Sequence, residues 1–351
     1  MESVTANQGG QPPAPNTPMQ QGNLLRYEGK LLRVYGISVI NFFLTILTFF
    51  IYRPWARTRM RRYVYGKIMI KGDPLRYTGT GGELFGAMVF VFAIYFAFSL
   101  MLGATDLVAM FMVGVEKLQQ AQETGEFTAY HLVSWVTSTL SSFALVYVIF
   151  FGNYTGRRYR LTRSKWHGVH GNLVGKPLRY ANKAFLLFLL NIITLGLIKH
   201  RNDMKLRSIM VQDLRFGNVE CGFANNYKVL NKVHFITWAL AIPTLGLSRL
   251  WYKAALMNQF MRQMTAGRIV FDATHTGNRW GGLVIGNFLL MMTFIGVPWA
   301  IQRYVKYMTK HIVITGEIDE ASLLQGGELG KATGDILDDF DGGIDFDMGV
   351  F

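Results

Sequence analysis

Four long apolar stretches of this 351-residue chain contain no Asp, Glu, Lys, Arg or His, and they restrict its possible folds more than any other feature. These stretches are 34–52, 84–105, 132–156 and 280–302, with lengths of 19, 22, 25 and 23 residues. A helix needs about 20 apolar residues to cross the hydrocarbon core of a bilayer. The four runs therefore predict membrane-crossing helices. Two shorter runs, 184–198 and 235–248, have 15 and 14 residues, and the sequence leaves open whether they cross or re-enter.

The first run ends in a junction that is typical of a membrane surface. Tyr52 and Trp55 follow the apolar residues, and they are joined by a cluster of basic side chains: Arg53, Arg57, Arg59, Arg61 and Arg62. Aromatic and then basic residues mark the cytoplasmic end of many membrane helices. Similar junctions follow three later runs, and a threonine anchors each of the four junctions: Thr48, Thr194, Thr244 and Thr293. The last three are 50 and 49 residues apart, which predicts an internal repeat.

Short alternating segments stand between the junctions. Residues 67–71 and 75–77 flank the turn residues Gly72, Asp73 and Pro74, and this pattern predicts strand, turn and strand. We therefore expect an all-α multipass membrane protein with internal repeats, whose short extended β elements lie on the cytoplasmic face. This repeat-containing membrane domain is predicted at 24–320. A disordered tail at 1–23 is expected before it, and an acidic disordered tail at 321–351 after it.

The distribution of charge predicts the orientation of the chain. Segment 106–131 holds four acids against one lysine, whereas the flanks 53–83 and 157–183 are basic, so the loop of the hairpin 84–156 is expected outside. The net charge is +14, and from Glu317 to the end it is −9, so the first 316 residues carry +23. Because these cations flank apolar runs, they favour anionic lipid headgroups as partners rather than nucleic acid.

Several motifs resemble one known family. They are Tyr52-Arg53-Pro54-Trp55-Ala56, Arg61-Arg62-Tyr63, the segment 75–81, Arg158-Tyr159-Arg160-Leu161-Thr162, and Trp166-His167-Gly168. On these residues the chain resembles the YjgN-like bacterial inner-membrane proteins, a domain of unknown function, over roughly 24–320. The family pattern prefers Leu-Gly where Phe49-Phe50 stands, and Leu195-Gly196 and Leu245-Gly246 keep that pair. The resemblance implies a multipass location in the inner membrane and no particular activity.

Two groups of residues are candidate functional sites. Arg57, Arg59, Arg61 and Arg62 could contact anionic lipid, or they could serve only to set topology. Asn41, Asn191 and Asn287 each lie in an apolar run. They could form hydrogen bonds between helices, which is the interpretation we favour, or a polar seam that lines a path. The glycine-rich segment 79–86 opens an apolar run and is either a close turn or a headgroup contact.

No constellation of acids, bases and nucleophiles points to catalysis. His167 and His170, with Asp203 and Cys221, fall short of a recognisable zinc pattern, so no metal or cofactor is expected. We therefore expect a non-enzymatic multipass inner-membrane protein that organises lipid or partner proteins. The alternative is a transporter or channel with a path at the repeat interface. The sequence does not identify a protein partner.

Overall fold

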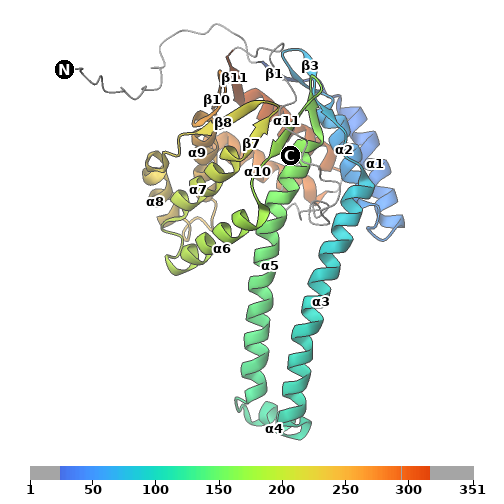
Figure 1. Cartoon of the computed structure of the whole chain (residues 1–351), viewed down its shortest axis with the longest axis vertical. Coiled ribbons are helices and arrows are strands. Elements are labelled where there is room, and N and C mark those ends of the chain that lie inside the picture. The colour runs from blue at the N-terminus through green and yellow to red at the C-terminus, as the bar shows by residue number, and fades with distance from the viewer. Residues whose placement is uncertain (1–23, 294, 317–351) are drawn as a thin grey trace, which may run out of the picture.

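The computed structural model describes residues 24–293 and 295–316 of the chain. The tails predicted at 1–23 and 321–351 lie outside the described residues, as does the end of the domain predicted at 24–320. Within the described residues the chain forms helices that alternate with short strands (Figure 1).

The strands form two antiparallel sheets. In the described part of the chain they are β1 Leu25–Tyr27, β2 Ile68–Ile70, β3 Asp73–Pro74, β4 Arg76–Tyr77, β5 Ser164–Trp166, β6 Val169–Leu173, β7 Leu214–Phe216, β8 Val219–Phe223, β9 Met264–Ala266, β10 Ile269–Ala273 and β11 Ile312–Thr315. Strands β1 to β3 form a three-stranded sheet, and β4 to β11 form an eight-stranded sheet in which sequence neighbours are paired. Strand β11 also contacts β1.

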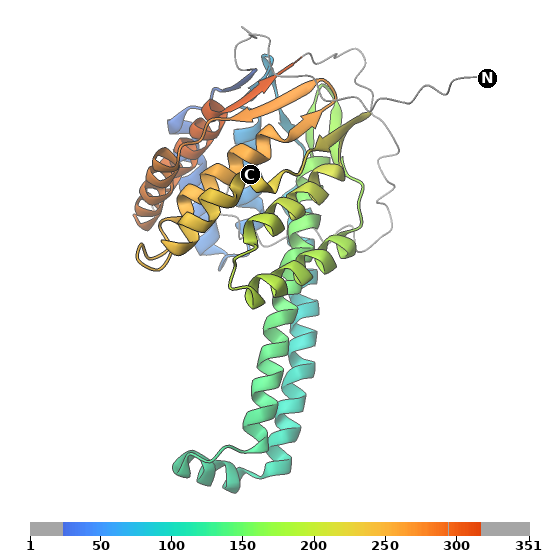
Figure 2. The ribbon, with the colours of Figure 1, turned by 90° about the vertical axis from the view of Figure 1, so that its left-hand side faces the viewer.

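These sheets show that the predicted all-α fold is wrong. Segments of two to five residues are too short to be stable as isolated hairpins. Here each hairpin pairs with the next across a long stretch of chain, as Arg76 of β4 does with Lys165 of β5. The pairing adds strand to strand until one sheet covers a whole end of the molecule (Figure 2). The short extended elements are therefore a principal layer of the fold.

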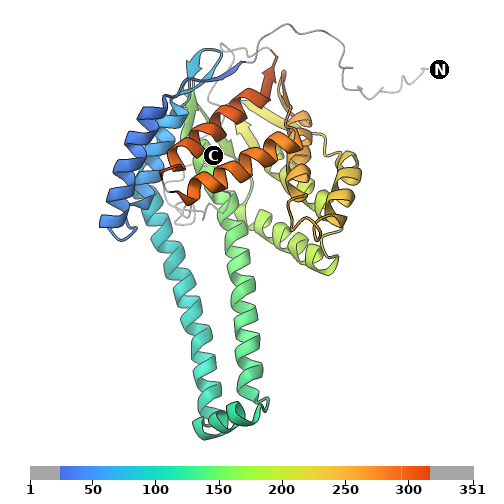
Figure 3. The same ribbon diagram turned by 180° about the vertical axis from the view of Figure 1, so that it is seen from behind.

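Helices occur in pairs between the strands. They are α1 Leu31–Leu47, α2 Arg53–Tyr65, α3 Gly81–Val113, α4 Val115–Thr124, α5 Ala129–Thr162, α6 Pro177–Ile193, α7 Lys199–Gln212, η1 Tyr227–Leu230, α8 Asn231–Ala239, α9 Arg249–Arg262, α10 Gly277–Met292 and α11 Val297–His311. The succession of strand, helix, turn, helix and strand occurs five times in the described chain. Neighbouring pairs are in contact, and α11 returns to α1, so the pairs follow one another around a ring (Figure 3).

One pair is much longer than the others. Helices α3 and α5 have 33 and 34 residues, which corresponds to about 50 Å at 1.5 Å per residue, and α4 joins their far ends. They project well beyond the other pairs (Figures 1 and 2). Among the described helices, only these two have the length and apolar composition to cross a membrane. Only 6% of the most apolar window of each is buried, so these helices expose their apolar side chains instead of forming a protein core.

The expectation that all four long apolar runs cross is therefore corrected. Runs 34–52 and 280–302 overlap helices α1 and α10, which have 17 and 16 residues and are about 25 Å long, and the chain then turns back into α2 and α11. Hydropathy registers the apolar side chains but not the reversal of the backbone between them.

Three of the reversals share one backbone geometry. Two consecutive residues have positive φ at each turn: Phe49 and Phe50 at +48° and +70°, Leu195 and Gly196 at +49° and +79°, Leu245 and Gly246 at +49° and +82°. The second residue of each pair donates its amide to the carbonyl five residues earlier, with N–O distances of 2.7–2.8 Å. A threonine precedes each turn, and its hydroxyl donates to the carbonyl four residues earlier. The pairs α1–α2, α6–α7 and α8–α9 thus end in compact turns.

We predict that Gly246→Ala destabilises the protein by about 1 kcal/mol, because a Cβ at left-handed φ is strained. An added Cβ would meet no atom within 4 Å, so the loss isolates backbone strain. The reciprocal change Phe50→Gly places glycine where an exposed Phe now holds φ at +70°, and it should stabilise the fold. The apparent Tm in detergent, at one scan rate, measures both. Gly282→Ala, a helical glycine with equally open surroundings, is the control. An unchanged Tm for Gly246→Ala would contradict the argument.

Candidate lipid-headgroup site

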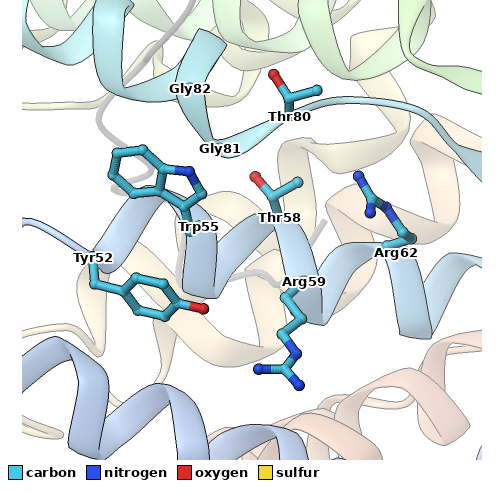
Figure 4. Close-up of a pocket in the computed structure, with 8 residues that line it drawn as sticks. All are labelled: Tyr52, Trp55, Thr58, Arg59, Arg62, Thr80, Gly81 and Gly82. Carbon is cyan, nitrogen blue, oxygen red and sulfur yellow. The ribbon is translucent and has the colours of Figure 1, made fainter.

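A pocket lies where α2 meets the start of the long helix α3. Its volume is about 500 Å³, and it is lined by Tyr52, Trp55, Thr58, Arg59, Arg62, Thr80, Gly81 and Gly82 (Figure 4). One wall is therefore the basic, aromatic face of α2, and the other is the amino-terminal turn of a helix of 33 residues. The pocket joins two features that the sequence analysis singled out separately: the arginine cluster and the glycine-rich segment.

Only some of the cations of helix α2 are exposed at the pocket. Arg59 and Arg62 are three residues apart, so they lie on one face of the helix, and both are exposed. Arg62 donates from Nη2 to the Gly79 carbonyl oxygen at 3.1 Å, which ties it to the segment that leads into α3. Arg61 is buried and Arg57 is half-buried, and neither lines the pocket. Of the four predicted arginines, Arg59 and Arg62 line the pocket, and their side chains point in different directions from α2 (Figure 4).

Aromatic residues lie beside these cations. The Trp55 ring stacks on Tyr52, with centroids 6.2 Å apart, and packs against Phe85 of α3 at 5.3 Å. Gly81 makes this approach possible, because a Cβ at that position would lie 2.4 Å from Trp55 Cδ1. The glycine-rich segment therefore serves as a close contact between two helices, as one of its two interpretations proposed.

The first turn of α3 is capped by side chains of the same turn and tied to α5. Thr80 accepts a hydrogen bond from the Glu83 amide, and the Glu83 carboxylate accepts one from the Thr80 amide. Glu83 also accepts from the Tyr159 hydroxyl at 2.6 Å and from Arg163 at 2.9 Å. This carboxylate thus fixes α3 to α5 at one end of the long pair. Thr137 donates to Asp106 at 2.9 Å near the other end, and most of the apolar surface lies between these two polar contacts.

The family model described as "Bacterial protein of unknown function (DUF898)" matches residues 23–248 and 239–340. The chain belongs to this family. Its curated relatives include the inner membrane protein YjgN of Salmonella typhimurium (strain LT2), 41% identical over 71 residues, and that of Escherichia coli (strain K12), 38% identical over 71 residues. Each match covers 20% of this chain and only 18% of the relative. No solved structure matches the chain significantly.

The family assignment confirms the resemblance inferred from the motifs. The names of the relatives and the exposed apolar surface of α3 and α5 both support a location in the inner membrane. The family description names no activity.

The three predicted asparagines lie in separate helix pairs. Asn41 donates to the Ala56 carbonyl at 3.0 Å, and Asn287 donates to the Ala300 carbonyl at 3.2 Å. Asn191 accepts from Asn202 of α7 at 2.8 Å. Each amide therefore joins the two helices of its own pair. The structure does not bring the three together.

His167 and His170, the two histidines considered as metal ligands, instead lie close to oxygen atoms of other elements of the fold. His167 lies 3.0 Å from an Asp73 carboxylate oxygen, and His170 Nδ1 lies 2.7 Å from the Thr162 carbonyl oxygen. Across the described residues, no group of three or more His, Cys, Asp or Glu side chains is placed to hold a metal ion.

A second junction repeats the contact between tryptophan and glycine, which the sequence-based prediction did not include. Trp251 of α9 approaches Gly277 at the start of α10, where a Cβ would lie 2.1 Å from Trp251 Cδ1. The spacing from Trp to Gly is 26 residues here, as it is from Trp55 to Gly81, and this shared spacing was the available signal. In α9 the positions of Arg59 and Arg62 are occupied by Ala255 and Asn258. The cations therefore distinguish the junction beside α3 from its counterpart.

Proposed function

We propose that this protein is a non-enzymatic inner-membrane protein that binds anionic lipid headgroups at the cytoplasmic surface and thereby organises lipid or partner proteins there. In this proposal α3 and α5 cross the membrane, α4 lies outside, and the sheets lie in the cytoplasm. The five strand–helix–helix–strand units are copies of one internal repeat. The second copy has lengthened to cross the bilayer.

The pocket supports this proposal, because it lies at the level where the apolar run of α3 begins. The charge-free run begins at residue 84, two positions after the pocket residue Gly82. Lipid headgroups at that level would meet the exposed guanidinium groups of Arg59 and Arg62, and their glycerol regions would meet Trp55 and Tyr52. Cations near an anionic surface contribute about 1 kcal/mol each, and tryptophan and tyrosine favour the same interface.

The expected result is that Arg59→Ala with Arg62→Asn lowers the affinity for phosphatidylglycerol about thirtyfold, since two charges contribute about 2 kcal/mol. These replacements copy the residues that α9 carries at the matching positions, which limits damage to the fold. Native mass spectrometry of the purified protein, titrated with phosphatidylglycerol or phosphatidylcholine, measures the affinity.

The matched control removes two exposed cations of the strand layer, Arg26→Ala with Arg268→Asn, and should leave the affinity unchanged. Equal phosphatidylglycerol binding by the pocket variant and the wild type would reject the headgroup site. An equal loss of affinity for both lipids would show that the two arginines are needed for folding and not for headgroup binding.

A transporter or channel at the repeat interface is the second candidate. It is supported by the contact of α11 with α1 and of β11 with β1, since a ring of repeats surrounds an axis along which a path could run. Solute or ion flux into proteoliposomes that contain the purified protein would favour this candidate over the lipid-organising one.

A further inference from the structure

The turns of the four short helix pairs, α1–α2, α6–α7, α8–α9 and α10–α11, expose large apolar side chains. Among the most exposed are Leu245 at 94%, Phe49 at 88%, Leu195 at 78% and Ile295 at 76%. All four pairs lie on the side of the sheets from which α3 and α5 project (Figures 1 and 3). Large apolar side chains that share one face are unfavourable in water. The contacts of the neighbouring helices indicate what covers that face.

Helix α6 gives the depth of one turn relative to α5. The Phe185 ring lies 6.1 Å from Phe143 and 5.8 Å from Tyr147, and Tyr147 donates to Asn182 at 2.6 Å. Tyr147 lies nine residues inside the charge-free run of α5, about 14 Å from the end of that run at residue 156. If α5 crosses the bilayer, α6 therefore packs against it below the headgroups.

The turn backbone suits a medium without water. Unpaired amides and carbonyls are costly in hydrocarbon. In three of the turns the amide of the second positive-φ residue bonds to a carbonyl five residues earlier, as described above. Carbonyls at the α6–α7 turn are also used by the next pair: Trp238 Nε1 donates to the Leu195 carbonyl oxygen at 2.9 Å, and His234 Nε2 lies 3.2 Å from that of Gly196. Polar backbone groups at this turn are thus satisfied by protein.

The same turns cannot complete a crossing. The first helices of the short pairs have 17, 17, 9 and 16 residues, whereas a span needs about 20. The second helices start with a cation in three cases: Arg53, Lys199 and Arg249. A long basic side chain a few residues beyond the turn can extend back to the headgroups on the side from which the chain entered the leaflet.

We propose that the turns of α1–α2, α6–α7 and α8–α9 are inserted among the acyl chains of the cytoplasmic leaflet and return without crossing. The runs 184–198 and 235–248 are then re-entrant. The proposal rests on the crossing of α3 and α5 in the proposed function, and it does not depend on the headgroup pocket. It gives the protein three apolar turns inserted in one leaflet beside a single spanning pair.

The test places a nitroxide at Leu195→Cys or Leu245→Cys in the full chain with Cys221→Ala, reconstituted in phosphatidylglycerol and phosphatidylcholine vesicles. Accessibility to oxygen and to a water-soluble nickel chelate reports depth in the bilayer. Thr265→Cys on the sheet is the aqueous reference. Phe96→Cys, 64% exposed in the middle of the α3 run, is the deep reference.

The expected result is that Leu195→Cys and Leu245→Cys labels collide with oxygen and are protected from the chelate by at least tenfold relative to Thr265→Cys. Chelate access at the two turns, with Phe96→Cys protected, would overturn the insertion while leaving the spanning pair intact. Access only from the side opposite Thr265→Cys would show that the turns cross, which also overturns it. Chelate access at Phe96→Cys would overturn both the insertion and the spanning pair.

Discussion

Gly81→Ala is expected to destabilise the protein by about 3 kcal/mol, because overpacking a close helix contact forces backbone to move. The new Cβ would lie 2.4 Å from Trp55 Cδ1 and 2.8 Å from Trp55 Cα. Rotation of the indole could relieve the first overlap, but the second involves the backbone of α2 itself. Helices α2 and α3 must therefore separate, and the pocket between them must change shape.

Gly82→Ala is the matched control for this prediction. The residue is next in sequence and in the same helical turn, yet an added Cβ there meets nothing within 4 Å. Alanine is preferred to glycine in a helix by about 1 kcal/mol, so this variant should be as stable as the wild type or more so. Apparent Tm in detergent compares the two. A Gly81→Ala protein with the Tm of Gly82→Ala would show that the Trp55 contact does not constrain the junction.

Lipid binding separates the junction beside α3 from its counterpart between α9 and α10. Gly277→Ala brings a Cβ within 2.1 Å of Trp251 and should lower the Tm as Gly81→Ala does. Only Gly81→Ala should also weaken phosphatidylglycerol binding, because Arg59 and Arg62 have no cationic counterpart in α9. Equal binding losses in both glycine variants would indicate general unfolding as the cause.

The sequence predicted local features of the fold better than their assembly. The pattern around Gly72 correctly indicated strands on both sides of a turn, but the turn is Lys71–Gly72, and Asp73 and Pro74, predicted as turn residues, form strand β3 and pair with β2. The pattern could not indicate that β4 would pair with β5, because the partner of Tyr77 is Ser164, on the far side of the long helix pair. Nothing in the local sequence encodes that partner, and the sheet arises from such distant pairings.

The apolar runs show a second limit. Run 34–52 approaches the length of a span, yet Phe49 and Phe50 adopt positive φ and reverse the chain. Leu-Gly at the later turns indicates the reversal, since glycine tolerates that conformation, whereas Phe-Phe gives no such signal. Composition therefore overestimated the number of spans where the turn residue was atypical.

The sequence predicted only part of the candidate site, because it does not show which side chains share a face. Counting arginines treated four cations as equal, but a helix turns about 100° per residue and separates them. Arg61 lies on the buried side of α2, while Arg59 and Arg62 face the pocket. The other wall, from Thr80 to Gly82, follows β4 in the chain, and its place opposite α2 depends on the tertiary fold.

Cysteine labelling should give an all-or-none result for the proposed crossing and orientation of α3 and α5. In a Cys221→Ala background, Thr124→Cys at the exposed end of α4 is expected to react with an impermeant maleimide in intact spheroplasts. Thr265→Cys on the sheet should react only after permeabilisation. The physical reason is charge, because segment 106–131 around α4 is acidic, whereas the opposite ends of α3 and α5 adjoin the basic residues.

The native thiol gives little background in this experiment, because Cys221 is buried and burial raises its pKa, which leaves less of the reactive thiolate. Its replacement by Ala removes the remaining ambiguity. If Thr124→Cys and Thr265→Cys both react in intact spheroplasts, the sheet and α4 lie on one side, and a crossing by α3 and α5 is rejected. The reverse pattern, with only Thr265→Cys labelled before permeabilisation, would keep the crossing but invert it. The arginine pocket would then face the outer leaflet, and the cytoplasmic headgroup site would be excluded.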